Sequence, residues 1–228
     1  MKKNKDKSLL FGGVMLSLFA LWTLLVVMVD VQPVGVNGTG IGFAGLNCWF
    51  HSVTGVNLQL YYITDWLSII PFLICSCFAL VGFCQLIKRK SLIRVDVDII
   101  LLGVYYSMVI FCYVAFEIIP INYRPVLING VMEVSYPSST TLLVLAVMPT
   151  LTFYCKRNMK SATIFKIIRF STTLFSFVMV MARLISGVHW LTDIVGGILL
   201  SSGLFNIYKG IFVLYDRQKL KGNKNGIL

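Results

Sequence analysis

Arg183, His189 and Asp193 are ionisable residues whose types and spacing are suited to nucleophilic or acid–base chemistry. His189 and Asp193 stand four residues apart, so on a helix they share a face and the carboxylate can accept the imidazole Nδ1 proton. That bond would fix the tautomer and leave Nε2 free as a nucleophile or a base. Gly187 predicts a break that lets Arg183 turn back to the same point, and Trp190 is expected to anchor at the membrane interface. The alternative is a structural His–Asp pair that neutralises a buried carboxylate.

Two further segments carry residues that suit an anion. Arg124 precedes Pro125, and its planar guanidinium fork matches phosphate oxygens. Pro137 precedes four hydroxyl residues, Ser138, Ser139, Thr140 and Thr141. A proline before such residues indicates a helix start, and a helix amino terminus offers free N–H groups to an anion. Capping alone would also explain Ser138 or Ser139.

The composition of the chain is that of a membrane protein, so membrane-spanning helices must position these residues. The chain is 57% apolar and 13% charged, with a mean hydropathy of +0.84, whereas soluble domains carry about 25% charged residues. A membrane-spanning helix needs about 20 predominantly apolar residues. Six stretches qualify: 9–29, 65–87, 97–116, 138–155, 164–185 and 189–214. We therefore expect an all-α bundle of six transmembrane helices, forming a single membrane domain over residues 1–228.

The basic residues predict how the helices are oriented. Of the 20 lysines and arginines, 18 fall on one side of the six stretches, and the positive-inside rule makes that side cytoplasmic, with both termini. The net charge of +11 then reflects topology and attraction to anionic headgroups rather than nucleic-acid binding. The ionisable groups at the opposite boundary are Arg124, Arg183, Glu117, Glu133, His189 and Asp193. Such groups at a bilayer edge cost several kcal/mol unless paired or hydrated, so their clustering predicts a functional site.

The remaining segments carry little chemistry. Residues 30–64 are rich in glycine and asparagine, and we expect a lid or a surface turn there. His51 in this segment is expected to be structural. The six cysteines show neither a disulfide framework nor a metal-binding spacing, so we expect no metal and no cofactor.

These motifs resemble those of the type-2 phosphatidic acid phosphatase superfamily of integral-membrane lipid phosphate phosphatases. The third family motif, Ser-Arg, five residues, His, three residues, Asp, is matched by Arg183, His189 and Asp193, with Ala182 in place of serine. The second, Pro-Ser-x-His, is matched by Pro137-Ser138-Ser139, with Thr140 at the histidine position. The first, Lys, six residues, Arg-Pro, keeps Arg124-Pro125 but has Glu117 at the lysine position. The resemblance covers essentially the whole chain.

The resemblance implies a role for each matched residue. His189 would attack phosphorus to form a phosphohistidine, with Asp193 orienting the ring. Arg124, Arg183, Ser138 and Ser139 would hold the phosphoryl oxygens, and water would release phosphate without a metal. The expected partners are a lipid phosphate substrate and membrane lipids, with no nucleic acid, and the expected site is on the non-cytoplasmic side of a multi-pass protein of the cell membrane.

The departures at Thr140 and Glu117 leave three interpretations open. The family histidine normally protonates the leaving group, and general acid catalysis is worth about 10²–10⁴-fold. The substrate could be a diphosphate, whose leaving phosphate needs little protonation, or Glu117 could supply the proton while Thr140 donates a hydrogen bond. The chain could also bind a lipid phosphate without cleaving it. A phosphotransferase that uses the same histidine is a further alternative.

Overall fold

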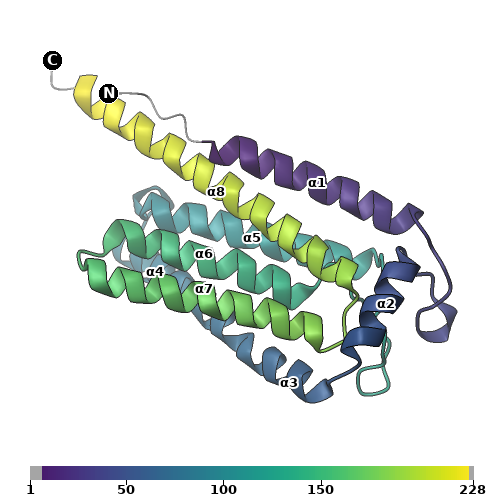
Figure 1. Cartoon of the computed structure of the whole chain (residues 1–228). Helices are drawn as coiled ribbons and strands as arrows, with labels where there is room; N and C mark the ends of the chain where they lie inside the picture. The colour runs from purple at the N-terminus through teal and green to yellow at the C-terminus, as the bar shows by residue number, and fades with distance from the viewer. Residues whose placement is uncertain (1–6, 226–228) are drawn as a thin grey trace.

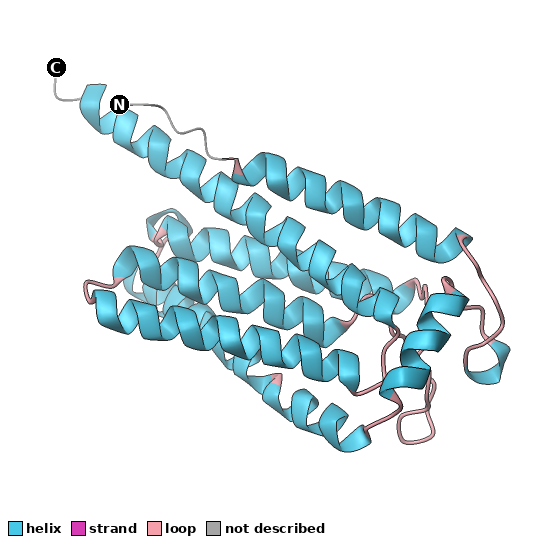
Figure 2. Cartoon of the chain, viewed as in Figure 1, coloured by secondary structure: helices cyan, strands magenta, loops and turns pink. Residues whose placement is uncertain are grey.

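The computed structural model describes the backbone of residues 7–225 and the side chains of residues 7–219. This part of the chain is helical and contains no β-strand (Figures 1 and 2). Two 3-10 turns are η1 (Val36–Gly38) and η2 (Leu92–Arg94). The α-helices are α1 (Ser8–Met28), α2 (Ala44–Thr54), α3 (Leu58–Leu67), α4 (Ile69–Arg89), α5 (Val97–Ile118), α6 (Ser139–Asn158), α7 (Ala162–Ile185) and α8 (Leu191–Asn225). Among the basic residues expected on the cytoplasmic side, Lys2, Lys3, Lys5 and the side chains of Lys221 and Lys224 lie outside the described part.

The predicted six-span, all-α architecture is confirmed. The helical stretches long and apolar enough to cross a membrane are Ser8–Met28, Leu58–Arg89, Val97–Ile118, Ser139–Asn158, Ala162–Ile185 and Leu191–Lys219. The second begins earlier than expected because α3 and α4 follow each other across a break at Ser68. The last begins two residues later than expected, because His189 and Trp190 belong to the preceding turn.

The glycine-rich segment 30–64 forms more regular structure than the predicted surface turn. It contains η1, α2 and α3, which cover one end of the bundle (right in Figure 1). Asn47 of α2 is buried and pairs with Thr192 in the first turn of α8, donating to its hydroxyl at 3.0 Å and accepting from its N–H at 3.3 Å. Asn57 caps α3 by accepting a hydrogen bond from the N–H of Leu60 at 2.9 Å. The segment is thereby attached to the helix that follows His189.

Helix α8 packs closely along α1 (Figure 1). Glycines on both helices make this possible, because a Cβ at Gly12 of α1 would lie 2.8 Å from the main-chain nitrogen of Ile207, and one at Gly203 of α8 would lie 2.6 Å from Leu16. Small residues allow such close approach between helices in a membrane. The position of α8, and of Asp193 in its first turn, is therefore fixed by backbone packing.

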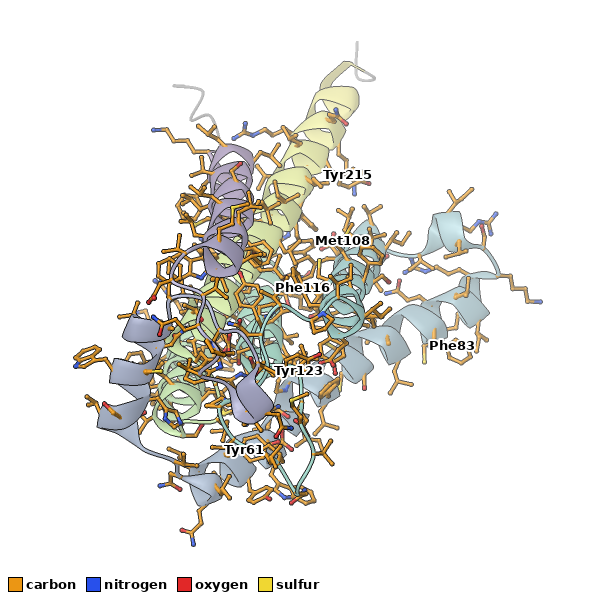
Figure 3. All side chains as sticks on the ribbon, turned by 90° about the vertical axis from the view of Figure 1, so that its right-hand side faces the viewer. Tyr61, Phe83, Met108, Phe116, Tyr123 and Tyr215 are labelled. Atoms are coloured by element: carbon orange, nitrogen blue, oxygen red, sulfur yellow. The ribbon has the colours of Figure 1, made fainter. Side chains whose placement is uncertain are left out.

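Aromatic contacts fix the segment that leads into α6. The buried Tyr136 ring stacks on Phe19 at a centroid distance of 6.3 Å and meets Phe116 edge-on at 5.9 Å. Its hydroxyl forms a 2.7 Å hydrogen bond with Thr23 of α1. Figure 3 looks onto this end of the bundle, where Tyr61, Phe116 and Tyr123 are labelled. The candidate residues converge at this end.

Candidate active site

His189 lies in the short turn between α7 and α8, with 1% of its side chain exposed. Its Nδ1–H donates to the main-chain carbonyl of Ser135 at 3.2 Å. The predicted hydrogen bond to Asp193 is therefore wrong, because the nearest carboxylate oxygen stays 3.6 Å from Nδ1. The physical reason is that His189 precedes the helix instead of sharing a helical face with Asp193. Nε2 is nevertheless without a hydrogen-bond partner in the described structure, although it is buried.

Asp193 stabilises the turn that carries His189. Its Oδ2 accepts a hydrogen bond from the N–H of Trp190 at 2.9 Å, and its Oδ1 accepts one from the Asn122 side chain at 3.2 Å. A carboxylate three residues into a helix that bonds the N-cap N–H is one half of a capping box. The main-chain carbonyl of Asp193 also accepts from the N–H of Ser138 at 3.0 Å, which joins the start of α8 to the start of α6.

Trp190 is buried, and its expected role as an interfacial anchor is wrong. Only 3% of the residue is exposed, and its indole N–H donates to the carbonyl of Tyr123 at 2.8 Å. Its ring lies 5.6 Å from that of His51, whose Nε2–H donates to the carbonyl of Gly187 at 3.1 Å. These contacts bind the His189 turn to α2 and to the segment after α5.

Arg124 and Arg183 lie against one tyrosine. The Arg183 guanidinium lies 4.5 Å from the Tyr61 ring centroid, and that of Arg124 lies 5.2 Å from it. Arg183 donates to the Thr64 hydroxyl at 3.0 Å and lies 3.7 Å from the carboxylate of Asp65. These contacts leave Nε of the buried Arg183 without a hydrogen-bond partner among the described residues. Helix α3, absent from the sequence-based prediction, therefore positions both cations.

Arg124 is only partly neutralised. Its Nη2 pairs with the Glu133 carboxylate at 3.0 Å, while Nε and Nη1 are buried and have no partner in the described part of the chain. The Arg124 side chain is 7% exposed, whereas that of Glu133 is 39% exposed. The pair therefore joins a buried cation to a carboxylate that is accessible to solvent.

The start of α6 presents unpartnered polar groups to the same region. Ser138 occupies the N-cap position, but its hydroxyl makes no capping hydrogen bond and is buried without a partner, so capping does not explain it. The first helical bond runs from the N–H of Leu142 to the carbonyl of Ser138. The N–H groups of residues 139–141 have no acceptor among the described residues, as is usual for a first helical turn.

The chemistry of these groups suits an anion with several oxygen atoms. Buried polar groups normally have hydrogen-bond partners, so a local group of unsatisfied ones needs an explanation. Here they are mainly donors, and two of the side chains carry a positive charge. The groups are Arg124 Nε and Nη1, Arg183 Nε, His189 Nε2, Ser138 Oγ and the N–H groups of residues 139–141.

The comparisons with known proteins agree with this arrangement. The family model described as the PAP2 superfamily matches residues 74–214. The chain belongs to the PAP2 superfamily. A solved structure, that of a transmembrane PAP2-type phosphatidylglycerolphosphate phosphatase from Bacillus subtilis, is similar with a TM-score of 0.62 and 15% identity, over 88% of this chain and 95% of that chain. At this identity the likeness shows a common fold. Comparison with curated proteins yields no match.

The residues that depart from the PAP2 motifs lie at the edge of this group. Thr140 is buried in the first turn of α6. Glu117 is exposed on α5 and forms no ion pair with either arginine within the described structure. Together with the half-buried Ser139, it lines a cavity of about 10 Å³, which is roughly the space of one water. Glu133, rather than Glu117, is the acidic residue that forms an ion pair with Arg124.

The electrostatic environment keeps His189 of this PAP2 protein neutral. Burial, followed by the positive charges of Arg124 and Arg183, lowers the pKa of His189 well below its usual range. A lowered pKa means that the ring stays uncharged at and above about pH 6.5, where an ordinary histidine is half protonated. Nδ1 keeps its proton and donates it in the hydrogen bond to the Ser135 carbonyl, so Nε2 carries the lone pair of the neutral ring.

This state is testable by ¹⁵N NMR because the chain has only two histidines. In the His51→Gln protein with labelled histidine, we expect His189 to show the neutral Nδ1–H tautomer throughout pH 6–8. Comparison with the spectrum of the parent protein assigns the signals, because those of His51 are absent from the variant. A His189 protonation midpoint at or above about pH 6.5 would contradict the expected environment.

Gly187 is required at the turn that carries His189. Its φ is +66°, and a Cβ there would lie 1.8 Å from the carbonyl oxygen of Gly55. The left-handed conformation alone costs other residues roughly 1–2 kcal/mol. We expect Gly187→Ala to lower the free energy of unfolding by at least about 2 kcal/mol, measured by denaturation in detergent micelles.

Gly103→Ala is the matched control for that substitution. A Cβ at Gly103 meets nothing within 4 Å and lies within helix α5, where alanine is preferred to glycine by about 1 kcal/mol. We expect this variant to be as stable as the parent or more stable. Equal stability of the two variants would show that Gly187 has no special role.

Several residues that position the site have no recognisable sequence signal. Asn122 contacts Asp193, and the Ser135 carbonyl contacts His189, each across more than 50 residues of the chain. Tyr61 and Thr64 contact Arg183 across about half the chain. The one available signal was Asn57, a residue type that favours the N-cap and would have predicted the start of α3.

Proposed function

We propose that this PAP2 protein is a membrane-embedded phosphatase that removes a phosphoryl group from a lipid phosphate or lipid diphosphate. The observation that carries the proposal is the group of buried, unpartnered donors around His189 Nε2. The family supports it, as does the fold shared with a phosphatidylglycerolphosphate phosphatase. Phosphoryl transfer depends mostly on positioning and on neutralising the charge of the transferred group, and this site offers both.

The proposed reaction has two steps and uses side chains, main-chain N–H groups and water. The His189 Nε2 lone pair attacks phosphorus, the bond from phosphorus to the leaving oxygen breaks, and a phosphohistidine forms. Water then attacks phosphorus, the N–P bond breaks, and inorganic phosphate leaves. Arg124, Arg183, Ser138, Ser139 and the N–H groups of residues 139–141 stabilise the charge on the phosphoryl oxygens. Asp193 holds the turn that aims the ring.

The departures from the family motifs favour a diphosphate substrate. Thr140 is a much weaker acid than the family histidine, and Glu117 forms no ion pair with the arginines in the described structure. An alkoxide leaving group requires a proton, whereas a phosphate leaving group departs as a weak base. We therefore expect a polyprenyl diphosphate to be cleaved at least about 10-fold faster than phosphatidate, with water as the main phosphoryl acceptor.

The proposed site faces the non-cytoplasmic side of the cell membrane. The bulk of the basic residues lie at the opposite end of the helices, and the positive-inside rule makes that end cytoplasmic, together with both termini. The substrate then enters from the outer leaflet. The whole chain acts as one membrane domain, with lipids rather than nucleic acid as its partners and with no cofactor.

A lipid-phosphate-binding protein without hydrolytic activity is the second candidate. It is favoured by the pairing of Arg124 with Glu133, which places a carboxylate where a substrate anion would compete for the same guanidinium. Because Glu133 is 39% exposed, it can move into solvent when a phosphate binds. Both candidate functions require binding of a lipid phosphate, and only the phosphatase releases inorganic phosphate from it.

The test is phosphate release by the purified full-length protein in micelles. The substrates are a polyprenyl diphosphate, phosphatidate and phosphatidylglycerol phosphate, each labelled with ³²P on the terminal phosphoryl group. We expect release from the diphosphate, together with an acid-labile, base-stable label on the protein after rapid quenching. Binding without release from any substrate would leave the binding protein as the function. Discharge of the label to a lipid instead of water would indicate a phosphotransferase.

A further inference from the structure

A second cavity lies between α6, α7 and α8, toward the end of the bundle opposite the candidate active site (left in Figure 1). Its volume is about 440 Å³. Each helix contributes one basic residue to it: Lys156 near the end of α6, Arg169 near the start of α7, and Lys209 in the second half of α8. Three cations from three separate helices therefore face one space.

These three cations lack carboxylate partners among the described residues. Within the described part of the chain, none of them has a carboxylate oxygen within 4 Å. The neighbouring Arg157 differs, since it pairs with Asp216 at 2.5 Å and lies 3.9 Å from Asp98. Unneutralised like charges repel each other, so their convergence on one cavity suits an anionic occupant.

The rest of the cavity wall combines apolar side chains with the hydroxyl groups of threonine and serine. Leu145 and Met148 of α6 and Phe205 of α8 are among its apolar residues. Leu145 and Lys156 are eleven residues apart on α6, a distance of about 16 Å along the helix axis. Thr152 and Thr172, joined by a 2.8 Å hydrogen bond between their hydroxyls, connect α6 to α7 in the cavity wall. The cavity thus offers cations together with a wall of mixed apolar and hydroxyl side chains.

We propose that this cavity binds an anionic glycerophospholipid of the leaflet opposite the candidate active site. The phosphodiester lies among Lys156, Arg169 and Lys209, and the first part of an acyl chain lies along Leu145, Met148 and Phe205. Basic pockets between membrane helices at the cytoplasmic side are suited to anionic headgroups. The apolar side chains of the wall distinguish a lipid from a free phosphate, which would use only the cations.

Topology alone does not account for this arrangement. The positive-inside rule requires basic residues only on one side of the membrane, at any position around the bundle. Lys88, Lys160 and Lys166 are on that side, are exposed, and do not line the cavity. The three cavity cations satisfy the same rule and also line one cavity together with apolar side chains.

Native mass spectrometry of the purified full-length protein tests the proposal, with dioleoylphosphatidylglycerol as the probe and dioleoylphosphatidylcholine as the neutral comparison. We expect one tightly retained phosphatidylglycerol. Each cation near a membrane surface contributes about a five-fold change in affinity, so the combined Lys156→Gln, Arg169→Gln and Lys209→Gln variant should bind about 100-fold more weakly. The matched control carries Lys88→Gln, Lys160→Gln and Lys166→Gln, the same change in charge, and should bind as the parent does.

Further arms separate this site from the catalytic one and from a soluble anion. Arg183→Gln should retain phosphatidylglycerol, and millimolar glycerol 3-phosphate should not displace it. The proposal is overturned if phosphatidylcholine binds equally well, if both triple variants lose binding alike, or if glycerol 3-phosphate competes. If the cavity triple variant does not fold, Arg169→Gln and Lys209→Gln are measured singly, and unchanged binding in both would overturn it. These results do not depend on whether the candidate active site hydrolyses a lipid phosphate.

Discussion

His189→Gln is expected to lower phosphate release from a polyprenyl diphosphate by at least about 10³-fold and to abolish the ³²P label on the protein. Glutamine approximates the size of the ring and can donate to the Ser135 carbonyl, but it has no nitrogen lone pair with which to attack phosphorus. Lipid binding should persist, because both arginines and the start of α6 are unchanged. Rapid-quench labelling and steady-state phosphate release measure the two effects.

The control for His189→Gln is His51→Gln, which changes the only other histidine of the chain. His51 supports the carbonyl of Gly187 and belongs to the surroundings of the site. We expect this variant to keep the label and to lose less than about 10-fold in rate, because one neutral hydrogen bond contributes about 1 kcal/mol. A label that survives in His189→Gln would show that another residue is the nucleophile.

Arg183→Gln is expected to lower kcat/KM by about 10²–10⁴-fold, mostly through kcat. The side chain is 1% exposed, so its charge acts with little screening by solvent. Arg183→Lys should recover part of the rate, because lysine keeps the charge but not the planar fork. Steady-state kinetics with the same diphosphate separate kcat from KM.

A structural role of Arg183 needs a separate control, because Arg183 also attaches α3 to the bundle. Thr64→Val removes the hydroxyl that accepts the Arg183 hydrogen bond at 3.0 Å and leaves the charge in place. We expect this variant to lose less than about 10-fold in rate. If Thr64→Val and Arg183→Gln were equally impaired, the arginine would act by positioning α3 and not by neutralising phosphate.

The membrane architecture was predictable because hydropathy is a local property. A stretch of about 20 apolar residues has few alternatives to a spanning helix, and all six spans were located. Helix α3 was missed because its ten residues are too few to span a membrane and mix polar with apolar side chains. It was therefore merged with the preceding glycine-rich segment, although it contacts both arginines through Tyr61.

The contacts among the candidate site residues were less predictable than the identity of those residues. The third motif identified His189, Asp193 and Arg183 from their spacing, but the four-residue interval suggested a helical pairing that the structure does not have. The turn at Gly187 places His189 ahead of α8, where its partner comes from a segment 54 residues away. Trp190 was misassigned because its hydrophobic ring suits both a membrane interface and a buried contact.

The orienting partner of His189 is a main-chain oxygen, and this affects how the protein can vary during evolution. Every amino acid has a carbonyl group, so no substitution at position 135 removes the acceptor itself. Selection on the ring orientation therefore acts on the path of the backbone, through residues such as Tyr136 that fix that path. The tautomer of the imidazole therefore does not depend on the chemistry of the side chain at position 135, which is itself buried.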